Sequence, residues 1–436
     1  MAEQAHTHPA NIVTKCPLNL EDVDLFSPGA QEYWFDAYKI LHEEAPVLRI
    51  PGEGAFPGTD GFVITKYEDI AAIVADPYTY PQPSYGGASM ASDGNRRGAV
   101  ADAMARNTLR PTMELHKQHR IQLTDPWVGA TGAPRHREMI TRTVDELIDE
   151  WIDNGEVEFV TEFAAKLPQT VMTNILGFPL EDMPRLKLWG EAQVRRFVYG
   201  TGHRNLLSPE DERENAIALG EFMAYVQGQV TRKRANPGAD MTTFLTQVEY
   251  MGRKLTDQEC IGVIFGMHIG GLETTQYALA AEAQILAQQP DLMAEVRADR
   301  SKIRFFVEES LRVQAPTQGL STRMAGEDVE IRGVKIARGS ILHLRYGAGN
   351  RDPEEFECPD QVNIERPTVG RHLTFSQGPR VCPGAGLSRL EQNIAWDRLL
   401  DRIERLEFAP GKNDFTHQPG IMLGLRKLHL RFTKAP

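Results

Sequence analysis

Most of the chain repeats its hydrophobic positions at helical spacing. Between residues 101 and 313 the pattern is predominantly helical, most clearly over 139–153 and 257–288. Shorter stretches of the same kind cover 67–76 and 386–406. This spacing places apolar side chains on one face of a helix. We therefore predict a mainly helical body.

Short apolar runs bounded by turn residues predict strands in three places, 45–66, 317–345 and 421–432. In the first of them, VLRI and FVITK flank a Gly/Pro-rich turn, which is typical of a hairpin. Residues 1–30 are predicted to be an irregular lead-in. Since no internal repeat or linker divides the chain, we predict one domain that is mainly α with a small β portion.

The composition is that of an ordinary globular protein, with 436 residues, 41% of them hydrophobic and 25% charged. A net charge of −12 argues against wholesale nucleic-acid binding. The four cysteines show neither CxxC nor zinc spacing, which favours a reducing, cytoplasmic location. The N-terminus lacks an apolar leader, and the longest mostly apolar stretch, 261–272, is shorter than the roughly 20 residues of a membrane span. We expect no membrane partner.

One cysteine lies in an unusually irregular loop, FSQGPRVCPGAG, residues 375–386. Its three glycines permit positive φ angles and a close approach of other groups to the backbone. Cys382 directly precedes a predicted helix, whose N–H groups and dipole favour an anionic sulfur. Such a thiolate can be a nucleophile, a metal ligand or a haem ligand. The simplest alternative is a buried cysteine in a tight turn.

The loop resembles the haem-binding loop of the cytochrome P450 family of haem-thiolate monooxygenases through Phe375-x-x-Gly378-x-x-x-Cys382-x-Gly384. Arg380 stands two residues before the cysteine, where that family often has histidine or arginine. The resemblance implies that Cys382 is the axial iron ligand of haem b. It also implies the cytochrome P450 fold, a helical body with a long central helix over the haem and small β-sheets.

Further matches to the family occur in the right order. Glu309-Ser-Leu-Arg312 resembles its E-x-x-R helix, in which the two side chains meet at i and i+3. Arg366 occupies the place of the arginine that completes a structural triad in the family, and residues 350–353 match its NRDP pattern. Taken alone, an E-x-x-R pair would more often be an ion pair on the protein surface.

Basic residues offer partners for the two carboxylates of a haem. His116-x-x-x-Arg120 resembles the H-x-x-x-R of the family helix that crosses the haem, and Arg323 falls where a propionate-binding arginine is expected. With Arg380, these residues are implied to bind the propionates through charge-assisted hydrogen bonds. Without the resemblance, HKQHR would be interpreted as a solvated basic surface.

A stripe of small residues runs through the predicted helix 257–288. Gly262, Gly266, Gly270 and Thr274 recur every four positions and therefore lie on one side of the helix. Each interior glycine costs roughly 1 kcal/mol relative to alanine, which indicates that the stripe has a use. That use is either close packing against another helix or a groove above a cofactor and substrate.

The segment Gly270-Gly-Leu-Glu273-Thr274-Thr resembles the family's (A/G)-G-x-(D/E)-T-T sequence, in which the acid and the alcohol guide protons to dioxygen. The resemblance implies these catalytic roles for Glu273 and Thr274. His268 lies well off the small-residue stripe, so we expect it to face neighbouring helices rather than to bind iron.

The resemblance implies a bacterial-type monooxygenase that inserts one oxygen atom of O2 into a small, largely apolar organic substrate by hydroxylation, O-dealkylation or epoxidation. Since no flavin or iron–sulfur segment is visible, electrons would come from NAD(P)H indirectly, through a ferredoxin reductase and a ferredoxin. A basic face for the ferredoxin is predicted from Lys117, His119, Arg135, Arg137 and Arg389. A substrate pocket is predicted from Gly266, Ile269, Gly270, Gln318 and Ile421.

Two alternatives stay open at this point. One is a haem-thiolate peroxygenase that uses hydrogen peroxide directly, and the other is a non-catalytic haem sensor. Glu273 and Thr274 argue against the peroxygenase, because peroxide already carries the electrons and protons that this pair would help to deliver. Both alternatives keep the thiolate, so a spectrum of the ligated haem would not separate them from a monooxygenase.

Overall fold

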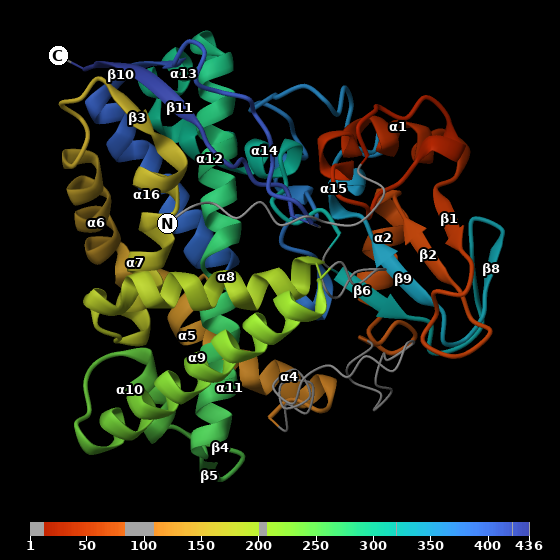
Figure 1. Ribbon diagram of the computed structural model, residues 1–436, viewed down its shortest axis with the longest axis horizontal. Helices are drawn as coiled ribbons and strands as arrows, with labels where there is room; N and C mark the ends of the chain where they lie inside the picture. Colours follow the sequence, from red (N-terminus) through yellow and green to blue (C-terminus); the bar gives the residue numbers. More distant parts are fainter. Residues whose placement is uncertain (1–12, 83–108, 200–206, 320, 421, 436) are drawn as a thin grey trace.

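The protein folds as a helical body flanked by a smaller part that contains most of the strands (Figure 1). A computed structural model describes residues 13–82, 109–199, 207–319, 321–420 and 422–435. Its α-helices are α1 (Trp34–Glu44), α2 (Tyr67–Ala75), α4 (Met113–His119), α5 (Asp125–Val128), α6 (Arg137–Asp149), α7 (Lys166–Leu176), α8 (Met183–Tyr199), α9 (Pro209–Ala235), α10 (Met241–Gln247), α11 (Asp257–Gly270), α12 (Glu273–Gln288), α13 (Pro290–Ala298), α14 (Ile303–Val313), α15 (Tyr346–Gly349) and α16 (Ala385–Arg402).

The strands form small sheets. The largest has the order β1-β2-β9-β6, in which β2 and β9 are parallel and the other neighbours antiparallel. A second sheet has the order β10-β11-β3, and two hairpins pair β4 with β5 and β7 with β8. The bounds are β1 (Val47–Ile50), β2 (Gly61–Ile64), β3 (Glu156–Glu158), β4 (Glu249–Tyr250), β5 (Arg253–Lys254), β6 (Ser321–Met324), β7 (Val329–Ile331), β8 (Val334–Ile336), β9 (Ile341–Leu344), β10 (Ile403–Phe408) and β11 (His429–Lys434).

Three predicted boundaries are wrong. The helical run 257–288 is broken at Leu272 (φ −100°, ψ −80°), which separates α11 from α12. The helix predicted over 386–406 ends at Arg402, because Ile403 turns extended and residues 403–408 pair with β11. The strand predicted from residue 421 starts only at His429, and the residues before it make isolated bridges.

Helices α11 and α12 follow one another along one line through the middle of the molecule (Figure 1). The hydroxyl of Thr256 accepts a hydrogen bond from the Glu259 N–H, and the Glu259 carboxylate accepts one from the Thr256 N–H, so a capping box starts α11. Apolar residues of both helices belong to the largest hydrophobic core, which also takes in α6, α7, α9 and α16. Among the described residues, no helix is both long enough and apolar enough to cross a membrane.

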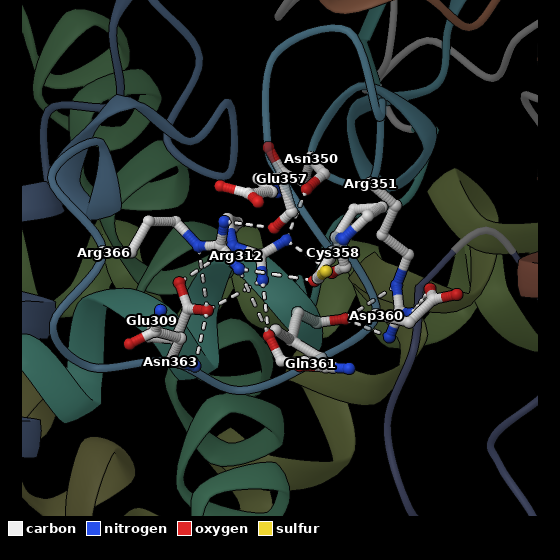
Figure 2. A network of polar contacts seen from close by, with 12 residues as sticks. Glu309, Arg312, Asn350, Arg351, Glu357, Cys358, Asp360, Gln361, Asn363 and Arg366 are labelled. Carbon is white, nitrogen blue, oxygen red and sulfur yellow. Dashed lines mark hydrogen bonds and ion pairs between the residues drawn. The ribbon is translucent and has the colours of Figure 1, made fainter.

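A buried network of charges organises the irregular chain that follows α15 (Figure 2). The guanidinium of Arg312 donates two hydrogen bonds of 2.8 Å to the carboxylate of Glu309, and neither side chain is exposed. Arg366 reaches the same carboxylate at 3.3 Å. The remaining donors of Arg312 bind the carbonyls of Asn350 and Pro359 at 2.8 and 2.7 Å. One buried carboxylate therefore fixes two arginines, which in turn hold the chain between residues 350 and 366.

We expect Arg312→Lys to lower the free energy of unfolding by about 3 kcal/mol, because an ammonium cannot reproduce the planar fork inside the core. Arg253→Lys is the matched control, since Arg253 also makes two hydrogen bonds to one glutamate, Glu259, but is half exposed. That variant should lose less than about 1 kcal/mol. Equilibrium denaturation followed by circular dichroism measures both, and equal losses would contradict the importance of burial.

Candidate functional site

The loop that carries Cys382 is held by backbone contacts. The Cys382 N–H donates to the Phe375 carbonyl at 2.8 Å. Gly378 has φ +69°, and a Cβ there would lie 2.9 Å from the Val74 carbonyl oxygen of α2. At Gly386 a Cβ would lie 2.6 Å from a backbone nitrogen of the loop after α5. Two of the three loop glycines are therefore required by conformation or by close approach.

A cluster of charged side chains contacts Phe375, the first residue of the cysteine loop. The carboxylate of Glu308 accepts hydrogen bonds from Arg389 at 2.5 and 2.8 Å and lies 3.1 Å from the His372 ring. The Arg389 guanidinium sits 4.4 Å from the centre of the Phe375 ring, a cation–π contact. Phe375 is therefore fixed by its ring as well as by its carbonyl.

The thiol of Cys382 lies where α16 begins. Burial raises its pKa above the ordinary value, while the N–H groups of Gly384 and Ala385 and the charges of Arg120 and Arg389 oppose that rise. The opposing groups all stabilise an anion. The site therefore suits a sulfur that would become a thiolate when a metal ion binds it and its proton is released.

A cluster of basic side chains lies beside this loop. Burial lowers the pKa of His116 to about 4, and the positive charges of Arg380, Arg110 and Arg120 act in the same direction. Arg120 also donates to the carbonyl of Val381 at 2.6 Å, directly before the cysteine. The structure thus brings three of the predicted carboxylate-binding residues together. It adds Arg110, which lies in no motif and was missed in the sequence.

Arg323, the fourth predicted member, lies buried on β6. Its guanidinium donates to the Ser321 hydroxyl and the Thr322 carbonyl, both at 2.9 Å. These contacts are within its own strand, so a contact of Arg323 with a propionate stays a prediction.

The glycine stripe of α11 faces open space within the part of the chain that the structure describes. A Cβ added at Gly262, Gly266 or Gly270 would meet no atom of the described residues within 4 Å outside the helix's own backbone. Close helix–helix packing, one of the two uses considered for the stripe, would have placed atoms there. The stripe leaves room along α11 up to the break at Leu272, directly before Glu273 and Thr274.

Glu273 stands in the first turn of α12, immediately after the break. Burial raises its pKa to about 7, the hydrogen bond donated by the Tyr277 hydroxyl at 2.9 Å lowers it, and the charge of Glu191 on α8 raises it further. The Thr274 hydroxyl donates to the Gly270 carbonyl at 3.1 Å. Tyr277 was missed in the sequence, although its i+4 spacing from Glu273 could have indicated it.

Other predicted residues fall in different surroundings. Gln318 is fully buried, accepts from the Tyr38 hydroxyl at 3.0 Å and donates to the Ala315 carbonyl at 2.7 Å. Its amide is thus used inside the fold, which speaks against a polar contact with substrate. Ile269 is partly buried against the main core. Ile421 lies outside the described residues.

Two further histidines named in the sequence analysis, His268 and His119, are buried. His268 is 2% exposed, and its ring packs against the Phe222 ring of α9 with the centroids 4.8 Å apart. It therefore faces a neighbouring helix, as expected. His119 is 3% exposed, and burial lowers its pKa to about 3. The prediction that His119 contributes a surface cation is therefore wrong.

The residues present fit a haem. A thiol at a helix N-terminus supplies an axial ligand, and the basic cluster supplies partners for two carboxylates. Buried nitrogens of Arg110 and His119 have no hydrogen-bond partner among the described residues, as expected of a site that receives an anion. The glycine stripe provides clearance on a neighbouring helix.

Comparison with known proteins agrees with this site. The family model described as Cytochrome P450 matches residues 218–432. Cytochrome P450 107B1 of Saccharopolyspora erythraea is 31% identical over 408 residues, covering 90% of this chain and 94% of that protein. The 6-deoxyerythronolide B hydroxylase of the same organism is 28% identical, covering 94% and 98%.

The architecture matches as well. The crystal structure of P450BioI in complex with hexadec-9Z-enoic acid ligated acyl carrier protein has a TM-score of 0.79 and 28% identity. The match covers 92% of this chain and 98% of that chain. The predicted fold class is thereby confirmed. The chain belongs to the cytochrome P450 family, whose members bind haem and use O2, and it is an oxidoreductase of the monooxygenase type.

Proposed function

We propose that this chain binds haem b through Cys382 and inserts one oxygen atom of O2 into a small, largely apolar organic substrate, with hydroxylation as the default outcome. Two electrons come from NAD(P)H through an external reductase and ferredoxin. When bound, the thiolate-ligated haem supplies the chemistry that activates O2. The protein's own residues position the substrate, exclude water and deliver protons.

The observation that carries this proposal is the geometry at the break between α11 and α12. A carboxyl group with a pKa of about 7 exchanges protons readily near neutral pH, which suits a general acid. Glu273 and Thr274 are consecutive residues at the start of α12, at the end of the glycine stripe. In the proposed function Glu273 supplies a proton that reaches dioxygen by way of the Thr274 hydroxyl, and the partly buried surroundings limit the entry of water.

Thr274→Ala should retain substrate binding but divert most electrons from product to hydrogen peroxide. Thr275→Ala is the matched control, because that hydroxyl lies 3.0 Å from the Ser388 hydroxyl on α16 and has no proposed part in proton delivery. The ratio of product formed to NADPH consumed, with a ferredoxin system, measures the coupling. Unchanged coupling in Thr274→Ala would contradict the role of its hydroxyl.

The same assay separates the two alternative functions. A peroxygenase would turn over with hydrogen peroxide and with no ferredoxin, whereas a sensor would give no product under either condition and would bind a partner protein in response to its ligand. Glu273 and Thr274 favour the monooxygenase, since neither alternative needs a poised proton donor.

Tyr277→Phe removes the hydrogen bond that stabilises the Glu273 carboxylate. The pKa of Glu273 should therefore rise above its present value of about 7, so Glu273 stays protonated to higher pH. We expect the inflection near pH 7 in the profile of coupled turnover to move to higher pH. Glu273→Gln should abolish that inflection, and an unmoved inflection in Tyr277→Phe would contradict the assignment.

We propose that a basic surface recruits an acidic ferredoxin for electron transfer. Of the residues that predict it, Lys117, Arg135 and Arg137 are exposed, whereas Arg389 is largely engaged by Glu308. Val381, next to the cysteine, is 36% exposed and adds an apolar point on this surface. Three exposed cations together with one exposed apolar side chain, Val381, would suit a short-lived electrostatic complex with the ferredoxin.

Charge reversal of Lys117, Arg135 and Arg137 together should slow reduction by ferredoxin about tenfold or more at low salt and remove most of its salt dependence. Arg405→Glu is the control, since Arg405 is exposed on β10 in a different part of the molecule (Figure 1). Stopped-flow reduction at several ionic strengths measures the effect. If the rate of reduction of the unmodified protein did not change with ionic strength, the proposed docking surface would be contradicted.

The relatives leave the substrate open but agree with a largely apolar one, since P450BioI was crystallised with a long unsaturated acyl chain on its carrier protein. Fold and haem chemistry do not identify a substrate. A spin-state titration with terpenoids, steroids, aromatic acids and alkyl ethers would identify the class that displaces water from the haem.

A further inference from the structure

The basic cluster beside the cysteine loop is larger than the family resemblance implies. Arg110, directly before α4, acts electrostatically on both His116 and His119, and Arg120 acts on the same two histidines. His116 and His119 are 6% and 3% exposed. With Arg380, which also acts on His116, five basic side chains therefore share a largely buried volume.

This volume holds more positive charge than negative. Among the described residues, the carboxylate paired with the cluster is Asp125, 2.8 Å from Nε of Arg120. Arg110 has no ion pair within that part of the chain, and its Nε is buried without a hydrogen-bond partner there. Both ring nitrogens of His119 are likewise without a partner among the described residues. Buried polar atoms of this kind destabilise the fold when nothing satisfies their hydrogen bonds.

Arg110 is held in place by its neighbours. The Tyr250 hydroxyl lies 2.7 Å from the Leu109 carbonyl and 3.0 Å from the Leu115 carbonyl, so it ties the backbone beside Arg110 to α4. Tyr250 is 1% exposed, and its ring meets the His119 ring edge-on with centroids 6.5 Å apart. Arg110 is therefore set on a fixed part of the fold beside His116, which suits recognition of a fixed ligand.

We propose that Arg110 binds a carboxylate at the edge of the haem site, supplied by a haem propionate. An arginine recognises a carboxylate through two parallel hydrogen bonds, and burial strengthens them. This inference rests on the proposed function, because it requires haem to be bound beside His116. A carboxylate on the substrate is the other source of the same chemistry, and the experiment below distinguishes the two.

Haem transfer from the holoenzyme to apomyoglobin tests the haem as the source. Arg110→Gln should release haem about tenfold faster than the unmodified protein, and Arg110→Lys should recover part of the difference because it keeps the charge. Arg142→Gln, which removes an exposed arginine on α6, should release haem at the unmodified rate. After reconstitution with iron protoporphyrin dimethyl ester, Arg110→Gln and the unmodified protein should release the cofactor equally fast.

The substrate arm uses spin-state titrations with fatty acids and their methyl esters. Unchanged haem release, together with loss of a preference for acid over ester in Arg110→Gln, would assign the carboxylate to the substrate. Unchanged haem release with unchanged preference would overturn the proposal. Failure of the unmodified protein to give a thiolate-ligated haem spectrum would instead count against the proposed function, so the two failures are distinguishable.

Discussion

The buried carboxylate of Glu309 is the interaction on which the cysteine loop depends. A carboxylate without exposed surface is tolerable only when each of its oxygens accepts strong hydrogen bonds. Arg312 and Arg366 supply them, and their remaining donors bind carbonyls of the chain between residues 350 and 366. That chain has little regular secondary structure, so charged side chains replace the hydrogen bonds that a helix or sheet would have provided. The thiol that follows is placed by this frame rather than by its own loop alone.

Helix α11 and its junction with α12 are locally less stable than regular helix, and the same features leave space along α11 and set the position of Glu273. Three glycines along α11 lower its intrinsic stability, and the break at Leu272 interrupts the hydrogen bonding between α11 and α12. Packing of both helices in the main core offsets these losses. The break also places Glu273 at a helix start, where it is partly buried without becoming part of the packed core. Desolvation at this position raises the pKa of Glu273 to about 7.

The sequence was sufficient for the fold class, which is indicated both by the helical spacing and by the motifs that resemble the family, whereas the roles of the cysteine-loop residues stay predictions. The sequence was insufficient where contacts with a distant segment of the chain override the local pattern. Leu399, Ile403 and Leu406 keep helical spacing, yet pairing with β11 places Ile403 and Leu406 in a strand. The HKQHR motif indicated surface cations, but packing against Tyr250 buries His119. Neither outcome can be derived from local residue order.

Burial assigns different roles to carboxyl groups that look alike in the sequence. Glu282 is fully buried and accepts a hydrogen bond from the Trp396 indole at 2.6 Å, which links α12 to α16. Burial raises the pKa of Glu282 well above its usual range, which favours the neutral form. Glu309 faces two arginines, whose charges compensate that of a buried carboxylate. Within the described part of the chain, Glu273 accepts a hydrogen bond from a tyrosine hydroxyl and faces no arginine, so it lies between these extremes, where a proton can be both held and released. The partner that each carboxyl group meets, more than its depth, therefore decides whether it supports the fold or serves the reaction.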